Sequence, residues 1–124
     1  MEITKRTTAE VLKHHMDVLG EGNVAETLLD YATEAVIITG GGVVKGQAEI
    51  RAFFINSVTN VLPPGSSFEL IKKVVEGEMA YIVWSAESPF YNIPLGTDTF
   101  VIRDGLIVGQ TFTGMMNKKD GSYK

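Results

Sequence analysis

The sequence predicts an α+β domain in which N-terminal helices cover one face of a curved, mostly antiparallel sheet. Helical periodicity occupies the first half of the chain, and strand-like alternation occupies the second half. Two runs rich in β-branched and aromatic residues flank Asp104-Gly105, a pair typical of tight hairpin turns. Helices that precede the strands, rather than alternating with them, argue against a parallel α/β fold.

Length and composition limit the possible functions. The 124 residues, 44% of them hydrophobic, suit one domain over residues 1–124 with a sizeable core. The net charge of -4 and the lack of a basic run before Lys118-Lys119 argue against a nucleic-acid partner. No apolar run approaches the roughly 18 residues that span a bilayer, and no signal peptide is recognisable. The absence of cysteine excludes disulfides and thiolate metal sites, so we expect a cytoplasmic protein.

The first helix is predicted to begin at a capping box over residues 7–10. Apolar residues then recur at helical spacing until two nearby glycines end the pattern. This spacing places His15 on the buried stripe and His14 on the solvent side, beside Glu10 and Asp17. We therefore expect His14 to be solvated, whereas His15 fits a structural core histidine as well as a functional one.

The middle of the chain is predicted to contain two more helices. A second N-cap at Asn23 predicts a short helix that ends near Thr33, followed by a strand over residues 35–39. The three glycines after this strand lack the lysine and the helix start of a phosphate-binding loop and are interpreted as a turn. A third, strongly amphipathic helix is predicted from Gly46 until Pro63-Pro64-Gly65 stops it.

The second half of the chain is predicted to form strands over residues 68–75 and 79–88, and on both sides of Asp104-Gly105. Because strand side chains alternate, Asp98 shares a face with Phe100. An acidic side chain is therefore directed toward the same place as the apolar ones. This carboxylate is the feature that any function must explain.

The register of the hairpin decides which side chains accompany Asp98. A two-residue turn would pair Asp98 with Thr111, and a three-residue loop with a glycine bulge would pair it with Gln110. We favour the bulged form, which turns Gln110 and Phe112 inward. It leaves an outer face of short side chains, suited to a second sheet and hence to a homodimer: Thr97, Thr99, Val101, Thr111 and Thr113.

Three segments, residues 31–38, 46–54 and 98–107, resemble the NTF2-like superfamily, whose members include SnoaL-like polyketide cyclases and ketosteroid isomerases. The resemblance extends over residues 8–116. It implies a cone of strongly bent sheet around a long helix, a mostly apolar cavity, and usually a homodimer formed through the sheet. The superfamily includes isomerases, cyclases, dehydratases, epoxide hydrolases and non-enzymatic binders, so the resemblance indicates a fold rather than an activity.

The resemblance to the ketosteroid isomerases is incomplete at the site. Asp98 falls where those enzymes have an aspartic acid that donates to the substrate oxyanion, and Tyr31 matches a tyrosine of the supporting network. His15 replaces the oxyanion-hole tyrosine, and Phe54 replaces the last tyrosine of the network. Thr39 stands where the catalytic base is expected, and its hydroxyl is too weak a base to abstract a carbon-bound proton. Steroid isomerisation by that mechanism is therefore not expected.

The sequence allows two locations for the side chain of Trp84. It shares a strand face with Ala80, Ile82 and Ala86, and that face could line the cavity or form the seam of a dimer. We favour the seam.

Two functions follow from these features. One is a SnoaL-like small-molecule enzyme that performs isomerase, cyclase, dehydratase or hydrolase chemistry on a largely apolar substrate, with His15 and Asp98 as an acid-base pair. No cofactor is expected, and two histidines on one helix do not make a metal site. The other is a non-catalytic binding or interaction module in which the pair is structural. The residues expected to bind the substrate are Tyr31, Phe53, Phe54, Phe100, Gln110 and Phe112. Tyr31 is expected to present its hydroxyl to the cavity.

Overall fold

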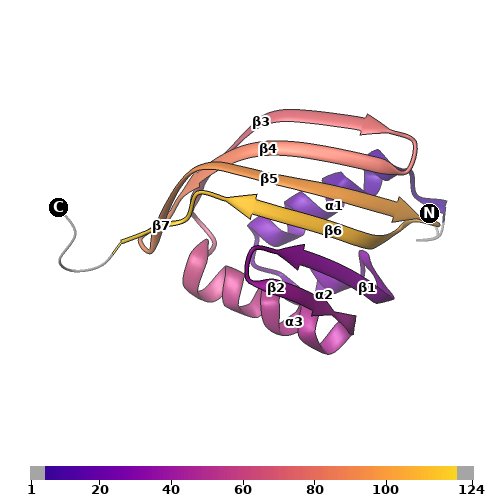
Figure 1. Ribbon diagram of the computed structural model, residues 1–124, viewed down its shortest axis with the longest axis horizontal. Helices are drawn as coiled ribbons and strands as arrows, with labels where there is room; N and C mark the ends of the chain where they lie inside the picture. The colour runs from indigo at the N-terminus through magenta and orange to yellow at the C-terminus, as the bar shows by residue number, and fades with distance from the viewer. Residues whose placement is uncertain (1–4, 120–124) are drawn as a thin grey trace.

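The computed structural model describes residues 5–119 and consists of a seven-stranded sheet that arches over helices (Figure 1). The helices are α1 (Thr8–Gly20), α2 (Val24–Leu28) and α3 (Gly46–Asn56), which the π-helical turn η2 (Ser57–Val61) extends. The strands are β1 (Tyr31–Thr39), β2 (Gly42–Lys45), β3 (Ser67–Glu76), β4 (Met79–Glu87), β5 (Tyr91–Arg103), β6 (Leu106–Gly114) and β7 (Asn117–Lys118). The strand order is β2-β1-β6-β5-β4-β3, with β7 beside β5. The predicted α+β class is confirmed: apart from the parallel pair of β1 and β6, the described strand pairs are antiparallel.

Local signals define the helix starts. The Glu10 amide donates to the Thr7 hydroxyl at 3.1 Å, and the Thr7 amide donates to the Glu10 carboxylate at 2.8 Å, so the predicted capping box is present. Asn23 caps α2 as predicted. The prediction that this second helix ends near Thr33 is wrong, because β1 already begins at Tyr31, where the chain pairs with β6.

The β5–β6 hairpin turns through Asp104 and Gly105, whose φ values of 53° and 74° are both positive, as a type I′ turn requires. The turn has two residues, so the predicted three-residue loop is wrong. The predicted facing is nevertheless correct, because one extra residue in β6, Val108, shifts the pairing further along the ribbon. Asp98 therefore lies opposite Phe112, neither of the two partners that the sequence suggested.

Two further bulges curve the sheet. One extra residue, Ile71, interrupts the pairing of β3 with β4, and Pro94 with Leu95 lies opposite Ser85 alone in the pairing of β4 with β5. Bulges increase the local twist, and proline is tolerated there because no ladder hydrogen bond needs its missing amide proton. The concave face of the bent sheet closes over α1 and α3 on a core whose fully buried members include Val11, Leu12, Ile37, Ile50, Phe100 and Ile107. No helix within residues 5–119 is long and apolar enough to cross a membrane.

His14 is only partly solvated, and the carboxylates that it contacts are not the Glu10 and Asp17 that the sequence suggested. Its Nδ1 lies 2.7 Å from the buried carboxylate of Asp30, and its Nε2 lies 3.2 Å from Glu26. Arg6 also donates to Asp30, at 2.8 Å, and to the carbonyl of Gly105 at 2.8 Å. This cluster joins α1, α2, the start of β1 and the hairpin turn. The hydrogen bond to Asp30 raises the pKa of His14, although burial opposes the rise.

The cluster predicts a pH-dependent contribution to stability. Both ring nitrogens of His14 face carboxylates, and only the imidazolium donates from both. Since the folded-state pKa lies above the ordinary value of 6.5, the stabilisation is fully present below that value. It is lost as the pH rises through the folded-state pKa. We expect the difference in unfolding free energy between wild type and His14→Gln to shrink from about pH 5 to about pH 9 in chemical denaturation.

Lys13→Gln provides the matched control, because Lys13 forms an exposed ion pair with Asp17 on the same helix. Its effect on stability is expected to be nearly constant over the same pH range. A wild-type advantage over His14→Gln that does not change with pH would contradict the role of His14.

Candidate functional site

A cavity of about 440 Å³ lies between α1, the α3–η2 segment and the concave face of the sheet, within the size range of small-molecule sites. Its wall is mainly apolar. The aromatic side chains that line it are Phe53, Phe54, Phe68, Trp84, Tyr91, Phe100 and Phe112. The lining residues with polar side chains are His15, Asn56, Ser57, Ser66, Ser67, Tyr91, Trp84, Asp98 and Gln110.

Asp98 faces this cavity from the middle of β5 and is 8% exposed. Its Oδ1 accepts a hydrogen bond from Trp84 Nε1 at 2.7 Å, and its Oδ2 accepts one from Gln110 Nε2 at 2.8 Å. The carbonyl oxygen of the Gln110 side chain accepts from the Tyr31 hydroxyl. Four strands thus supply one hydrogen-bond chain. Because the indole N–H can only donate and the Gln110 oxygen is already occupied, the arrangement fits an ionised carboxylate.

Two opposing effects act on Asp98. Burial raises its pKa above the ordinary carboxyl value, while the hydrogen bonds from Trp84 and Gln110 oppose the rise. Burial also raises the pKa of Tyr31 well above its ordinary value, with the charges of Asp98 and Asp30 acting in the same direction. Tyr31 therefore remains a neutral donor to Gln110.

His15 belongs to α1 and lines the cavity, and it is 4% exposed. Its imidazole packs edge-to-face with three aromatic rings. The ring centroids lie 5.4 to 5.9 Å from the imidazole and belong to Phe100, Tyr31 and Phe54. Its Nδ1 is buried without a hydrogen-bond partner in the described part of the chain. Burial lowers the pKa of His15 to about 4, helped by the charge of His14, so the imidazole is neutral near pH 7.

The structure corrects the expected contact between His15 and Asp98. Both side chains line the same cavity, but the carboxylate takes its hydrogen bonds from Trp84 and Gln110. No hydrogen bond joins His15 to Asp98 within residues 5–119, and the two groups therefore do not form the proton-sharing pair that the sequence suggested.

The other expected site residues are mostly brought together. Phe53, Phe54, Phe100, Gln110 and Phe112 all line the cavity. Tyr31 does not, because its hydroxyl is bonded to Gln110 behind the wall, so the expectation that it presents this hydroxyl to the cavity is wrong.

The prediction that Trp84 lies in a dimer seam is wrong. Trp84 is 7% exposed, lines the cavity, and binds Asp98 directly. A signal for its position exists in the sequence: its strand partner is Gly96, a small residue that leaves space for a large ring. That signal becomes visible only once the pairing of β4 with β5 is known.

Thr39, at the position expected of a catalytic base, lies outside the cavity wall, and its hydroxyl accepts the amide of Gly41 at 3.0 Å. Within residues 5–119, no group of three or more histidine, aspartate or glutamate side chains is arranged to hold a metal ion.

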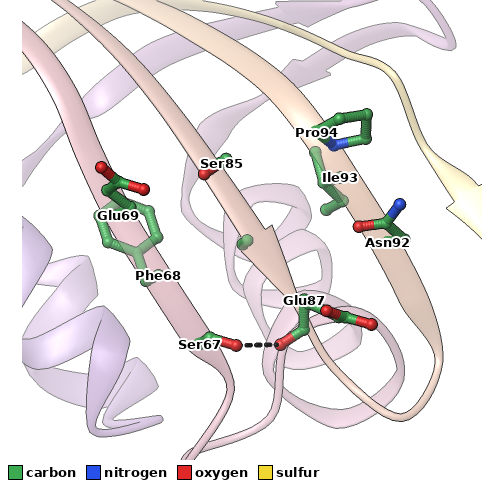
Figure 2. A pocket seen from close by; sticks show the side chains of 9 residues that line it. Ser67, Phe68, Glu69, Ser85, Glu87, Asn92, Ile93 and Pro94 are labelled. Atoms are coloured by element: carbon green, nitrogen blue, oxygen red, sulfur yellow. Dashed lines mark hydrogen bonds between the residues drawn. The ribbon is translucent and has the colours of Figure 1, made fainter.

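A second, shallow hollow of about 370 Å³ lies over β3, β4 and the start of β5 (Figure 2). Ser67 closes one end of it through a 3.4 Å hydrogen bond to the carbonyl of Glu87. The carboxylates that border it, Glu69 and Glu87, belong to exposed residues. Because it contains no buried ionisable side chain, we place the candidate site in the interior cavity.

Comparison with known proteins agrees with this architecture. A protein from Mesorhizobium loti described as NTF2-like and of unknown function superimposes with a TM-score of 0.72 at 23% identity, covering 86% of this chain and 89% of that one. An NTF2-like protein of unknown function from Cytophaga hutchinsonii gives 0.74 at 11% identity, with coverages of 89% and 91%.

The epoxide hydrolase/cyclase-like enzyme SalBIII, described with a role in pyran ring formation in the polyether salinomycin, gives a TM-score of 0.73 at 20% identity and covers 86% of this chain and 89% of its own. At these identities the likeness establishes the fold alone. No curated protein matches the sequence. The SnoaL-like domain family matches residues 12–110, most of the chain, and the protein therefore belongs to the SnoaL-like domain family.

Proposed function

We propose that the protein is a small-molecule enzyme that performs acid-base chemistry on a largely apolar substrate, with Asp98 as the group that accepts and returns a proton. The observation that carries this proposal is a buried carboxylate that faces an apolar cavity. Each of its two oxygens accepts a hydrogen bond, one from Trp84 and one from Gln110. Burial makes the carboxylate a stronger base, while the two donors keep it ionised and oriented.

The neutral imidazole of His15 supplies the complementary group. With a pKa of about 4 it carries no charge near pH 7, so it can offer an N–H to a substrate oxygen without holding a competing charge in the cavity. When Asp98 removes a proton from a carbon next to a carbonyl, the electron pair moves to the carbonyl oxygen, where the imidazole N–H stabilises the developing charge. Return of that proton to another carbon completes an isomerisation.

The proposed role of Asp98 differs from that of its counterpart in the ketosteroid isomerases, which the sequence resembles. There the aspartic acid donates to the oxyanion and a separate carboxylate is the base. Here the expected base position is Thr39, outside the cavity, and the donors around Asp98 fit the ionised form. Asp98, the one carboxylate among residues 5–119 that lines the cavity, therefore takes the role of the base.

The first test needs a ligand, which mass spectrometry of molecules copurifying with the protein can identify, followed by turnover assays. Asp98→Asn is a well-matched variant: the asparagine oxygen can accept from Trp84, and its amide can donate to Gln110 once the Gln110 amide turns over. We expect activity to fall by roughly 10²-fold or more with ligand affinity retained, because the base is lost and the hydrogen bonds are not.

His15→Gln is expected to reduce turnover with the same substrate, and Asp17→Asn, an exposed carboxylate on α1, serves as the control that leaves it unchanged. If Asp98→Asn and His15→Gln lower thermal stability but leave activity per folded molecule intact, the two residues are structural and the protein is a non-catalytic binder.

We also propose that the outer sheet face forms a homodimer. An uncharged row of side chains crosses five strands on this face, each residue paired with the next: Val74, Tyr81, Thr99, Thr111 and Ile38. Val74, Tyr81 and Ile38 are 45%, 39% and 50% exposed, respectively. An apolar and β-branched surface of this kind suits another sheet better than water.

Sedimentation at micromolar concentration is expected to show a dimer for the wild type and a monomer for Thr99→Lys, which places a charge at the centre of the row. Thr59→Lys adds the same charge at an exposed position on η2 and should remain dimeric. A monomeric wild type under these conditions would rule out the proposed assembly.

A further inference from the structure

The indole of Trp84 lies across a position where only glycine fits. Trp84 and Gly96 are direct partners on β4 and β5. A Cβ atom on Gly96 would come within 2.5 Å of Cε2 and Cζ2 of the indole. Gly96 does not have a left-handed backbone, so its own conformation would accept alanine. Glycine is therefore needed at position 96 only because the indole occupies the space of a side chain.

This placement brings the indole to the carboxylate. Asp98 lies two residues beyond Gly96 on the same strand face, and Trp84 Nε1 donates to its Oδ1 at 2.7 Å. The indole is stacked with two aromatic rings, with centroids 5.5 Å from Phe68 and 5.9 Å from Phe112 at interplanar angles of 26° and 16°. A shift of the indole away from Gly96 would disturb its contacts with these two rings.

We infer that Gly96 and Trp84 are positioning residues for Asp98: the absence of a side chain at Gly96 lets the indole lie flat and hold the carboxylate ionised and pointed into the cavity. A hydrogen bond donated to a carboxylate favours its ionised form, and it counteracts the burial of the same group. The consequence for catalysis rests on the proposed function, but the effect on Asp98 does not.

The wild-type protein contains its own probe, because Trp84 is its single tryptophan. In NMR, its one indole N–H signal is expected to shift with pH at the same midpoint as the side-chain carboxyl carbon of Asp98. In Asp98→Asn the indole signal should lose this pH dependence. If the chemical shift of the indole N–H in folded wild type does not change as Asp98 titrates, the inference is wrong, and no further variant is needed.

Trp84→Phe removes the donor while keeping a ring, and it is expected to increase the proton affinity of Asp98 by about tenfold or more. Gly96→Ala should act in the same direction, because the added methyl group displaces the indole. Gly109→Ala is the matched control: it adds a methyl group to the adjacent strand β6, where a Cβ would meet nothing within 4 Å, and it should leave the titration unchanged.

A double variant tests whether Gly96 acts through Trp84. In the Trp84→Phe background, Gly96→Ala should change the titration of Asp98 far less than it does in wild type, because the donor is already absent. Equal effects in both backgrounds, or a Gly96→Ala protein with wild-type indole and carboxyl titrations, would show the inference to be wrong. None of these measurements needs a substrate, so an absence of enzymatic activity would refute the proposed function and leave this result standing.

Discussion

The candidate site depends on the two hydrogen bonds that Trp84 and Gln110 donate to the buried carboxylate of Asp98. A carboxylate moved from water into an apolar cavity without partners loses solvation worth on the order of several kcal/mol, and it would take up a proton instead. Trp84 and Gln110 replace the lost water on both oxygens, and they come from β4 and β6, the strands on either side of β5. A usable carboxylate therefore requires three adjacent strands in the correct register.

That register depends on single extra residues in the strands. With a two-residue turn and no bulge, Asp98 would lie opposite Thr111, and Gln110 would face outward. Val108 adds one residue to β6 and returns Gln110 to the cavity side. The bulges on β3 and β5 lie on either side of Trp84 and bend the sheet there. The same local irregularities therefore curve the sheet and direct the side chains that serve the candidate site.

Two adjacent histidines show how strongly the surroundings control chemistry. His14 faces the carboxylates of Asp30 and Glu26, so its charged form is stabilised and its pKa is raised. His15 faces aromatic rings, and burial lowers its pKa to about 4. One turn of helix thus presents to a structural cluster an imidazole whose charged form is favoured, and to the cavity one whose neutral form is favoured. This separation allows the cavity to contain a carboxylate base beside a neutral donor, without a second charge.

The sequence alone determined the features that depend on near neighbours in the chain. Capping at Thr7 and Asn23, helical periodicity through His15, and the turn at Asp104-Gly105 are local, and the NTF2-like resemblance supplied the order of the layers. Strand alternation also placed Asp98 inside. The partners of Asp98, the side on which Trp84 lies, and the contact of His14 with the buried carboxylate of Asp30 were decided only by the tertiary structure. Those contacts join residues far apart in the chain, and the extra residues that align them, Ile71 and Val108, are ordinary strand formers that do not mark a bulge locally.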